Sequence, residues 1–385
     1  MSLAPYAMEA AHGRGRRYPQ PPHPYRNDYQ RDRDRIIHAR AFRRLEAKTQ
    51  VFTRRYSDHF RNRLTHTLEV AQIARTLAGA LGLNTDLAEA LALVHDIGHP
   101  PFGHAGEHKL NQLMQAHGER FDHNLHALRI VEHFEQRYAD FPGLNLTFEV
   151  REGIIKHSRE WKQADYPQLA EYRLGERPPL EAQLIDLTDE IAYNTADLDD
   201  GAEARHFPYA TIAEEVPVFG AVWAEVARQY STASPKLQFN EALRRLIDRL
   251  ATDLLETTRR TLTENHIDSV EAVRRHPQRL VRFSPAGAAE NRQLKDFLWR
   301  RLYHHPQILE ERDPAVQAVE ELFLLYCEQP QRLPRPYYEQ TQTLPDRQAG
   351  LPVHRVACDY IAGMTDTYLF RVHAEQLGSP ARETR

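Results

Sequence analysis

Apolar residues recur every three to four positions along most of this 385-residue chain, which is the period of amphipathic helices. The clearest example is residues 62–81, where leucines and alanines form one stripe and Gly82 follows as a helix stop. Neither an alternating strand series nor a glycine-rich phosphate loop occurs, and a short hairpin is expected at most near 44–55 or 144–148. We therefore expect a mainly α protein. The same periodicity predicts helices near residues 28–45, 86–96, 124–138, 148–160, 180–200 and 355–377, with amphipathic helices alternating with short loops over 205–327.

Two stretches break this helical pattern. Residues 1–27 are rich in proline, arginine and glycine and have no periodicity, which predicts a flexible arm or a segment ordered by a partner subunit. Residues 328–350 are rich in proline and glutamine and predict a loop or insertion before the final helix.

Composition excludes several classes of protein. Hydrophobic residues make up 41% and charged residues 27%, as in ordinary globular proteins, and no run of apolar residues is long enough to cross a membrane. The N-terminus has no apolar signal segment, and two cysteines are too few for a disulfide scaffold, so we expect a cytoplasmic protein. The net charge of -4 means that any anionic ligand must be held by a local basic cluster.

Histidine is frequent, with 21 residues, so a lone dipeptide such as His95-Asp96 means little by itself. Its setting adds weight, because the run HDIGHPPFGHAGE continues with His99, His104 and Glu107. Proline and glycine prevent this run from being plain helix. Polar residues in such a turn beside apolar helices rarely serve stability, so the run predicts a functional site.

Four residues could share one metal ion: His66, His95, Asp96 and Asp189. His66 lies near the start of one predicted helix, and His95 and Asp96 end the next, where the break after Gly98 lets both side chains reach one ion. Asp189 lies beside the buried face of a later helix, and a buried carboxylate needs a partner. Two nitrogen and two oxygen donors favour Mn, Fe, Co, Ni or Zn over Mg.

The pattern H…HD…D resembles the HD-domain superfamily of metal-dependent phosphohydrolases. Its finer signatures are similar to those of the bacterial dGTPase-like group of deoxynucleoside triphosphate triphosphohydrolases, and they span most of residues 28–370 in the family's order. HDIGHPPFGHAGE is the most specific of them. The matching stretches are RDRDRIIHARAFRRLEAKTQVF, RNRLTHTLEVAQIAR, HDIGHPPFGHAGE, DLTDEIAYNTADLDDG and RVACDYIAGMTD.

This resemblance implies an HD-domain multi-helix bundle with additional C-terminal helices that hydrolyses a dNTP, dGTP or another, to deoxynucleoside and triphosphate. His104 would be the catalytic histidine near the α-phosphate, with Glu107 hydrogen-bonded to it, and His99 would contact the phosphates. A carboxylate that fixes the tautomer of a histidine also raises its basicity, which suits proton transfer. Mn or Fe would be the resident metal, with Mg a common substitute.

Substrate contacts are implied by the same resemblance. Arg63, one turn before His66, could bind phosphate in a bidentate manner, and Lys156 is a candidate for the triphosphate. Tyr193 and Asp197 follow Asp189 on one helix face, where the matching residues pack on the sugar and bond its 3′-hydroxyl. A fifth residue, Gln50, matches a position near the base and sugar.

The stretch FDHNLHALRI departs from the pattern of many dGTPases, which have a glycine and a glutamine there. His123 and His126 stand in their place, as a histidine does in related dGTPase-like proteins. This departure argues against strict dGTP specificity, and it makes His123 a candidate for phosphate contact.

For the domains, we expect the HD core over 28–205 and a helical C-terminal region over 206–385 that completes the substrate site and makes oligomer contacts. The resemblance implies a homo-oligomer, often a hexamer in the family, and in some members a nucleotide activator or single-stranded DNA at subunit interfaces. No membrane partner is expected.

Three alternative functions are weighed against this one. A (p)ppGpp hydrolase would have an acidic Glu-Asp pair after its His-Asp, whereas Gly98-His99-Pro100 follows here. A cyclic-dinucleotide phosphodiesterase would need a Gly-Tyr-Pro signature, which the sequence lacks. A regulatory nucleic-acid-binding protein with a vestigial site would use the arginine-rich stretches 14–17 and 31–44, but the intact candidate ligands favour an enzyme.

Overall fold

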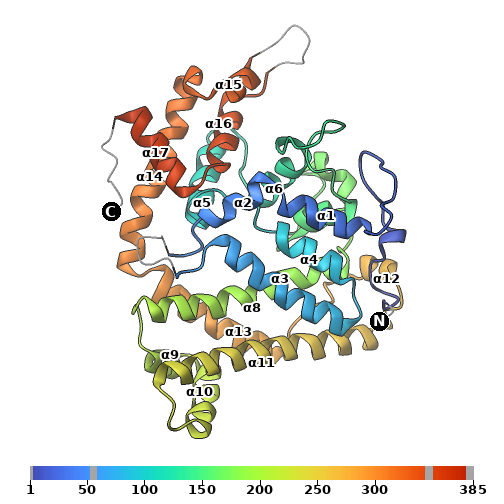
Figure 1. Cartoon of the computed structure of the whole chain (residues 1–385), viewed down its shortest axis with the longest axis vertical. Coiled ribbons are helices and arrows are strands. Elements are labelled where there is room, and N and C mark those ends of the chain that lie inside the picture. Colours follow the sequence, from blue (N-terminus) through green and yellow to red (C-terminus); the bar gives the residue numbers. More distant parts are fainter. Residues whose placement is uncertain (1–2, 53–58, 343–349, 379–385) are drawn as a thin grey trace. The chain divides into compact units, whose positions relative to one another are not determined.

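The computed structural model describes residues 3–52, 59–342 and 350–378, and regular structure in these ranges is helical (Figure 1). Backbone pairing within them is limited to three isolated bridges, Arg16–Thr147, Thr49–Asn62 and Gln136–Gly143. The mainly α class is thus confirmed, and the hairpin expected near 144–148 is absent. The other expected hairpin, 44–55, falls partly outside the described residues. Among the described helices, none is long and apolar enough to span a bilayer.

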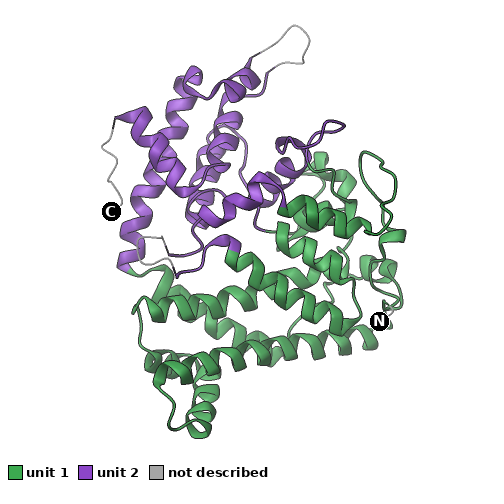
Figure 2. Cartoon of the chain, in the orientation of Figure 1, with its two compact units in different colours: residues 1–37, 65–95, 144–305 green, residues 38–64, 96–143, 306–385 purple. Residues whose placement is uncertain are grey.

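The chain divides into two compact units that do not follow sequence order (Figure 2). Unit 1 comprises residues 1–37, 65–95 and 144–305, and unit 2 comprises residues 38–64, 96–143 and 306–385. The boundary predicted at 205/206 falls inside unit 1, and the predicted domain division stays a prediction.

Unit 1 is built around the long helix α8, Leu180–Glu203, which packs against α4, α7, α11 and α13. Helix α4 begins where the sequence predicted, because the Asn84 side chain accepts hydrogen bonds from the first-turn amides of Asp86 and Leu87. Gly153 lets α7 approach α4 closely, since a Cβ there would lie 2.1 Å from Leu91. The helices of unit 1 are α1 (Asp28–Ile37), most of α3 (Arg63–Leu81), α4 (Thr85–Val94), α7 (Phe148–Lys156), α8, α9 (Tyr209–Glu215), α10 (Pro217–Gln229), α11 (Pro235–Glu264), α12 (Val270–Arg275) and α13 (Pro285–Leu298).

The N-terminal segment, which the sequence predicts as a flexible arm, makes specific contacts with unit 1. The backbone N–H of Met8 donates to Glu181 at 2.9 Å, and that of Arg14 donates to Glu149 at 2.8 Å. Both glutamates are fully buried, and burial raises the pKa of each. Arg16 also pairs with the buried Asp32 at 2.5 Å. Backbone amides and an arginine of residues 3–27 thus satisfy carboxylates of the helical core.

Unit 2 buries one apolar cluster in which α5 packs on α14 and α16, with α17 also against α14. The loop predicted over 328–350 contains a helix, α15, and its residues 343–349 lie outside the described ranges. The single final helix predicted by periodicity is two helices, separated by residues 363–365. The helices of unit 2 are α2 (Arg40–Arg44), α5 (Gly103–Gln115), α6 (His123–Arg129), α14 (Pro306–Glu328), α15 (Arg335–Thr341), α16 (Val353–Ala362) and α17 (Asp366–Leu377).

Candidate functional site

Three of the four predicted metal ligands converge within unit 1. His66 lies on α3, His95 is the residue that ends α4, and Asp189 lies on α8. Nε2 of His66 lies 2.9 Å from Oδ1 of Asp189, and Nε2 of His95 lies 3.8 Å from the same oxygen. The ring centroids of the two histidines are 5.7 Å apart. Residues distant in sequence therefore direct two ring nitrogens and a carboxylate to one point.

Hydrogen bonds orient the groups around this point. Nδ1 of His95 lies 2.6 Å from the carbonyl oxygen of Ala92. A carbonyl only accepts hydrogen bonds, so Nδ1 of His95 carries a proton, and Nε2 is the ring nitrogen that faces Asp189. Burial raises the pKa of Asp189, but the hydrogen bond with His66 and the neighbouring histidines outweigh it and lower that pKa to about 2. The carboxylate is therefore ionised at neutral pH.

His157, which sequence reasoning did not select, also faces this cluster. Its Nε2 lies 3.9 Å from Oδ2 of Asp189, and its ring centroid lies 5.3 Å from that of His95. Its Nδ1 lies 2.8 Å from a carboxylate oxygen of Asp186. The preceding residue, Lys156, was predicted to bind triphosphate, yet its ammonium donates to Glu152 and to two backbone carbonyls within unit 1. Adjacent residues at the end of α7 point apart, and His157 rather than Lys156 points toward Asp189.

Asp96, the fourth predicted ligand, belongs to unit 2 and is joined to His95 by a peptide bond. Its Oδ2 accepts a hydrogen bond from Arg63 at 2.7 Å, and its Oδ1 lies 3.2 Å from Nε2 of His99. Arg63 is buried, and in this structure it contacts a predicted metal ligand. Burial and the nearby charge of Arg63 lower the pKa of His99 well below its usual value, so this ring is neutral.

A carboxylate links the remaining histidines of the HDIGHPPFGHAGE run to α6. Oε1 of Glu107 lies 2.8 Å from Nδ1 of His123 and accepts its backbone N–H at 3.0 Å. Oε2 lies 3.4 Å from Nδ1 of His104, as expected for the predicted pair. Burial raises the pKa of Glu107, but hydrogen bonds with His104 and His123 outweigh this and lower it overall. Glu107 is thus an ionised acceptor shared by two histidines.

The two outer histidines of this cluster differ in exposure. The side chain of His104 is 84% exposed, so its free nitrogen can reach a bound molecule. The ring of His123 stacks on that of His99 with centroids 4.0 Å apart, and ligand-type atoms of His99, Glu107 and His123 lie within 4.8 Å of one another. His123, a candidate phosphate contact, lies against Glu107 and His99, and its contact with phosphate stays a prediction. His126, the other histidine of that stretch, is buried and lies 3.6 Å from Asp359.

The turn that carries these side chains has little room for side chains larger than hydrogen at Gly98 and Gly103. A Cβ at Gly98 would lie 2.0 Å from the carbonyl oxygen of His123. Phe102 and Gly103 both have left-handed backbone, with φ of 61° and 56°, and a Cβ at Gly103 would lie 2.7 Å from the guanidinium of Arg63. The glycines therefore allow close approach of the turn to α6 and to Arg63.

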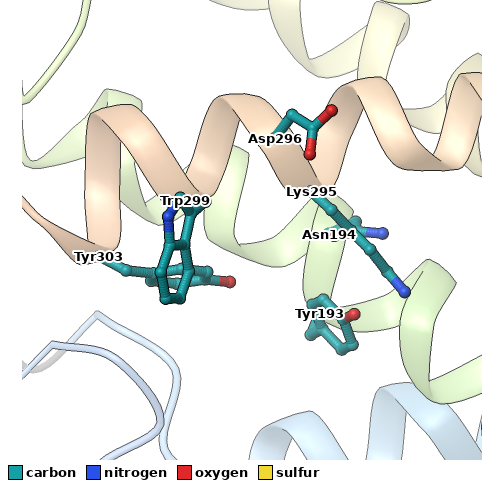
Figure 3. Close-up of a pocket in the computed structure, with 6 residues that line it drawn as sticks. All are labelled: Tyr193, Asn194, Lys295, Asp296, Trp299 and Tyr303. Atoms are coloured by element: carbon teal, nitrogen blue, oxygen red, sulfur yellow. The ribbon is translucent and has the colours of Figure 1, made fainter.

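Helix α8 continues from Asp189 into a pocket of about 290 Å³ in unit 1 (Figure 3). The hydroxyl of Tyr303 donates to Asp197 at 2.5 Å, and Lys295 lies over the ring of Tyr193 at 6.0 Å. Burial and nearby carboxylates raise the pKa of Tyr193, so it keeps its proton. The sequence predicted Tyr193 and also Asp197, which is bonded to the lining residue Tyr303, but it did not predict Asn194 or the lining residues that follow residue 294. The pocket is lined by Tyr193, Asn194, Lys295, Asp296, Trp299 and Tyr303.

Gln50 belongs to unit 2 and lies shortly before residues 53–58, which the structure does not describe. Its amide oxygen is buried and has no hydrogen-bond partner among the described residues. Its backbone oxygen lies 3.8 Å from where a Cβ of Gly103 would be. Gln50 is thus close to the turn that precedes His104, with one acceptor left for another molecule.

Comparison with known proteins assigns the family. The HD domain model matches residues 63–194, and the phosphohydrolase-associated domain model matches residues 281–375. Three similar relatives are each called deoxyguanosinetriphosphate triphosphohydrolase-like protein. The protein from Bordetella pertussis is 46% identical over 96% of this chain and 95% of its own length, and that from Thiobacillus denitrificans is 44% identical over 97% and 96%. The protein from Paracoccus denitrificans is 43% identical over 97% of this chain and its full length. The relatives match nearly the whole of both chains, so the chain belongs to the HD phosphohydrolases, in the deoxyguanosinetriphosphate triphosphohydrolase-like family.

Proposed function

We propose that this protein is a metal-dependent triphosphohydrolase that cleaves dGTP and other deoxynucleoside triphosphates to deoxynucleoside and triphosphate. The observation that carries the proposal is the convergence of His66 and His95 on Asp189, together with the peptide bond from His95 to Asp96. Consecutive Cα atoms are about 3.8 Å apart, so the backbone of Asp96 stays next to that of His95. The names of the similar proteins support the same substrate class.

The donor set fits a divalent ion. His66, His95, Asp96 and Asp189 would hold it through two ring nitrogens and two carboxylates, a mixture that favours Mn or Fe, admits Co, Ni or Zn, and leaves Mg as a substitute. When bound, such an ion polarises a phosphoryl oxygen and lowers the pKa of a bound water. The hydrogen bond from Nδ1 of His95 to the carbonyl oxygen of Ala92 fixes the ring, so the opposite nitrogen, Nε2, would be the one that holds the ion.

The chain's own residues supply the proton transfer and the binding of phosphate. Nδ1 of His104 faces Oε2 of Glu107, which orients the ring. The opposite nitrogen, Nε2, belongs to an exposed side chain and can give a proton to the departing nucleoside oxygen. Nδ1 of His123 is hydrogen-bonded to the other carboxylate oxygen, Oε1, of Glu107, and this bond fixes the orientation of the carboxylate. Neutral His99 and the permanent charge of Arg63 provide hydrogen bonds for phosphate oxygens. Lys156 has its donors engaged elsewhere, so it is not assigned to the triphosphate.

The pocket along α8 would take the deoxynucleoside. Asp197 can accept a hydrogen bond from a 3′-hydroxyl, and Tyr303 fixes the orientation of that carboxylate. Tyr193, which lines this pocket, would pack on the deoxyribose and exclude a 2′-hydroxyl. Trp299 is 61% exposed at the same pocket, so an aromatic surface is free to stack on a base. Gln50 has an unused acceptor for the sugar or base.

The remaining expectations are part of the same proposal: a cytoplasmic homo-oligomer, a hexamer or another size, that responds to a nucleotide activator or single-stranded DNA. The vestigial nucleic-acid-binding alternative gains no support from the arginine-rich stretches. Arg16 pairs with Asp28 and Asp32, and Arg33 pairs with Glu89 at 3.2 Å. Charges engaged in this way are less available for phosphate contacts.

The proposal is tested by product analysis. Purified protein is incubated with each dNTP, singly and mixed, with Mn²⁺ or Mg²⁺, and the expected products are deoxynucleoside and intact triphosphate. Asp96→Ala should abolish turnover and lower the bound metal, whereas Asp140→Ala, at an exposed position of unit 2, should change neither. Release of pyrophosphate or single phosphate, or full activity in chelator without metal, rejects the proposal.

A further inference from the structure

One carboxylate at the start of α17 contacts two segments that carry candidate site residues of unit 2. Oδ2 of Asp366 accepts the backbone N–H of Thr49 at 2.6 Å, and Oδ1 accepts the backbone N–H of Phe102 at 3.0 Å. Thr49 is followed by Gln50, and Phe102 is two residues before His104. Positions 49 and 102 are far apart in the chain, and Asp366 joins them through hydrogen bonds with their main chain.

The same place is reinforced by a buried lysine. The ammonium group of Lys48 donates to the carbonyl oxygen of His99 and, at 3.2 Å, to that of Ala362 at the end of α16. Arg44 donates to the next carbonyl of that turn, Gly363, at 2.8 Å. Two main-chain groups within the HDIGHPPFGHAGE turn, the carbonyl of His99 and the N–H of Phe102, are therefore linked through Lys48 and Asp366 to the junction of α16 and α17.

Phe102 is the position where such support is needed. It has left-handed backbone and precedes α5 without a side-chain cap of its own. A non-glycine residue in this conformation is held there only by its surroundings. Asp366 binds its N–H, and Phe370, one turn later on α17, packs against its ring with centroids 5.1 Å apart. Two side chains of α17 thus hold both the backbone and the ring of Phe102.

We propose that Asp366 is a positioning residue: through Thr49 and Phe102 it sets the geometry of Gln50, His99 and His104, so the phosphohydrolase-associated region helps to shape the catalytic turn. This inference rests on the proposed function for its kinetic consequence, but its structural consequence can be measured without any substrate. This positioning role is separate from stabilising α17. The N-terminal cap of α17 is another residue, Thr365, whose side chain accepts a hydrogen bond from the N–H of Tyr368.

That separation gives a matched pair of variants. Asp366→Asn keeps the size of the side chain but has one acceptor oxygen, so one of the two N–H groups loses its partner. Thr365→Ala removes the cap of the same helix and leaves both bonds of Asp366 intact. Asp366→Glu keeps two acceptor oxygens and takes the place of the Asn variant if that variant does not fold.

Hydrogen–deuterium exchange of the full chain is the first readout. Asp366→Asn should speed exchange at residues 49 and 102–107 at least tenfold, while Thr365→Ala should leave these amides within about twofold of the wild type. With dGTP and Mn²⁺, Asp366→Asn should lower kcat at least tenfold with a smaller change in KM and unchanged bound metal, because displaced catalytic groups lose rate more than binding. Thr365→Ala should keep kcat within about twofold.

Unchanged exchange at residues 49 and 102 in Asp366→Asn overturns the inference, as does an equal loss of kcat in Thr365→Ala. If the wild type hydrolyses none of the dNTPs, the proposed function fails, and the exchange comparison still decides whether Asp366 holds the turn.

Discussion

Replacing Gly98 with alanine introduces one methyl group where the HDIGHPPFGHAGE turn meets α6, and its effect can be worked out from distances. The added Cβ would lie 2.0 Å from the carbonyl oxygen of His123 and 2.5 Å from the backbone nitrogen of Ala127. Both are main-chain atoms, so no rotamer change relieves the contact. A normal separation of about 3.0–3.4 Å requires the turn and α6 to move apart by about 1 Å.

That movement has two measurable consequences. Overpacking of this kind destabilises a protein by about 1–3 kcal/mol. The displaced helix also carries His123, which holds Glu107 through two hydrogen bonds, at 2.8 and 3.0 Å. A shift of about 1 Å in groups near the reacting atoms can lower a rate about 100-fold. We therefore expect Gly98→Ala to lower kcat on dGTP between about tenfold and 100-fold, beyond any loss from unfolded protein.

The assay compares kcat, KM and urea unfolding with those of Gly79→Ala. Position 79 lies within α3, and a Cβ there would lie 3.7 Å from Thr85, an ordinary contact. Alanine favours helix over glycine by about 1 kcal/mol, so this control should be neutral or slightly more stable. A Gly98→Ala variant with kcat and unfolding free energy both equal to the wild type would falsify the steric argument.

Three further outcomes are expected. His104→Ala should lower kcat about 10²- to 10⁴-fold, as loss of a proton-transfer group does, with metal content unchanged by elemental analysis; a loss of metal would show that this residue is a ligand. Glu152→Gln should lower the unfolding free energy by about 3–5 kcal/mol, because the buried carboxylate pairs with Arg274 at 2.8 Å, whereas Glu241→Gln on the surface should have almost no effect in urea unfolding. Burial lowers the pKa of Lys48 from 10.5 to about 7, so between about pH 7 and pH 10 the unfolded chain binds more protons and stability rises with pH. Lys48→Met should reduce that rise in urea unfolding at several pH values, and an unchanged slope would count against the pKa.

Local signals in the sequence were enough to predict several elements of the fold. The stripe of apolar residues predicts α3, and the same period predicts α4 near its observed position, because both depend on neighbours within a few residues. The division between α16 and α17 was missed because the apolar period continues through Gly363. Helix α15 was missed because the proline content around it hides a short helix that begins after Pro334.

The residues of the candidate site likewise fall into those that a local motif predicted and those whose contacts depend on the folded chain. His66, His95, Asp96 and Asp189 were predicted because each stands in a distinctive motif. Which of two adjacent residues faces Asp189 depends on the direction in which α7 leaves the core, and no local pattern distinguishes Lys156 from His157. Tyr303 meets Asp197 across more than a hundred residues, and a tyrosine in WRRLY carries no signal of that contact. Asp366 was inside a recognised stretch, but its partners only become apparent once the chain is folded.

The segment Trp299–Tyr303, which contributes two residues to the pocket, forms a π-helix at the end of α13. A π-helix turn holds one residue more than an α-helix turn, so a single residue inserted into a helix produces one. Deleting one residue within it would restore plain α-helix and rotate the downstream residues by about 100°. Tyr303 would then leave Asp197, although every pocket residue would still be present in the sequence. At this point of the chain, the number of residues therefore determines the contact between Tyr303 and Asp197 as much as their identity does.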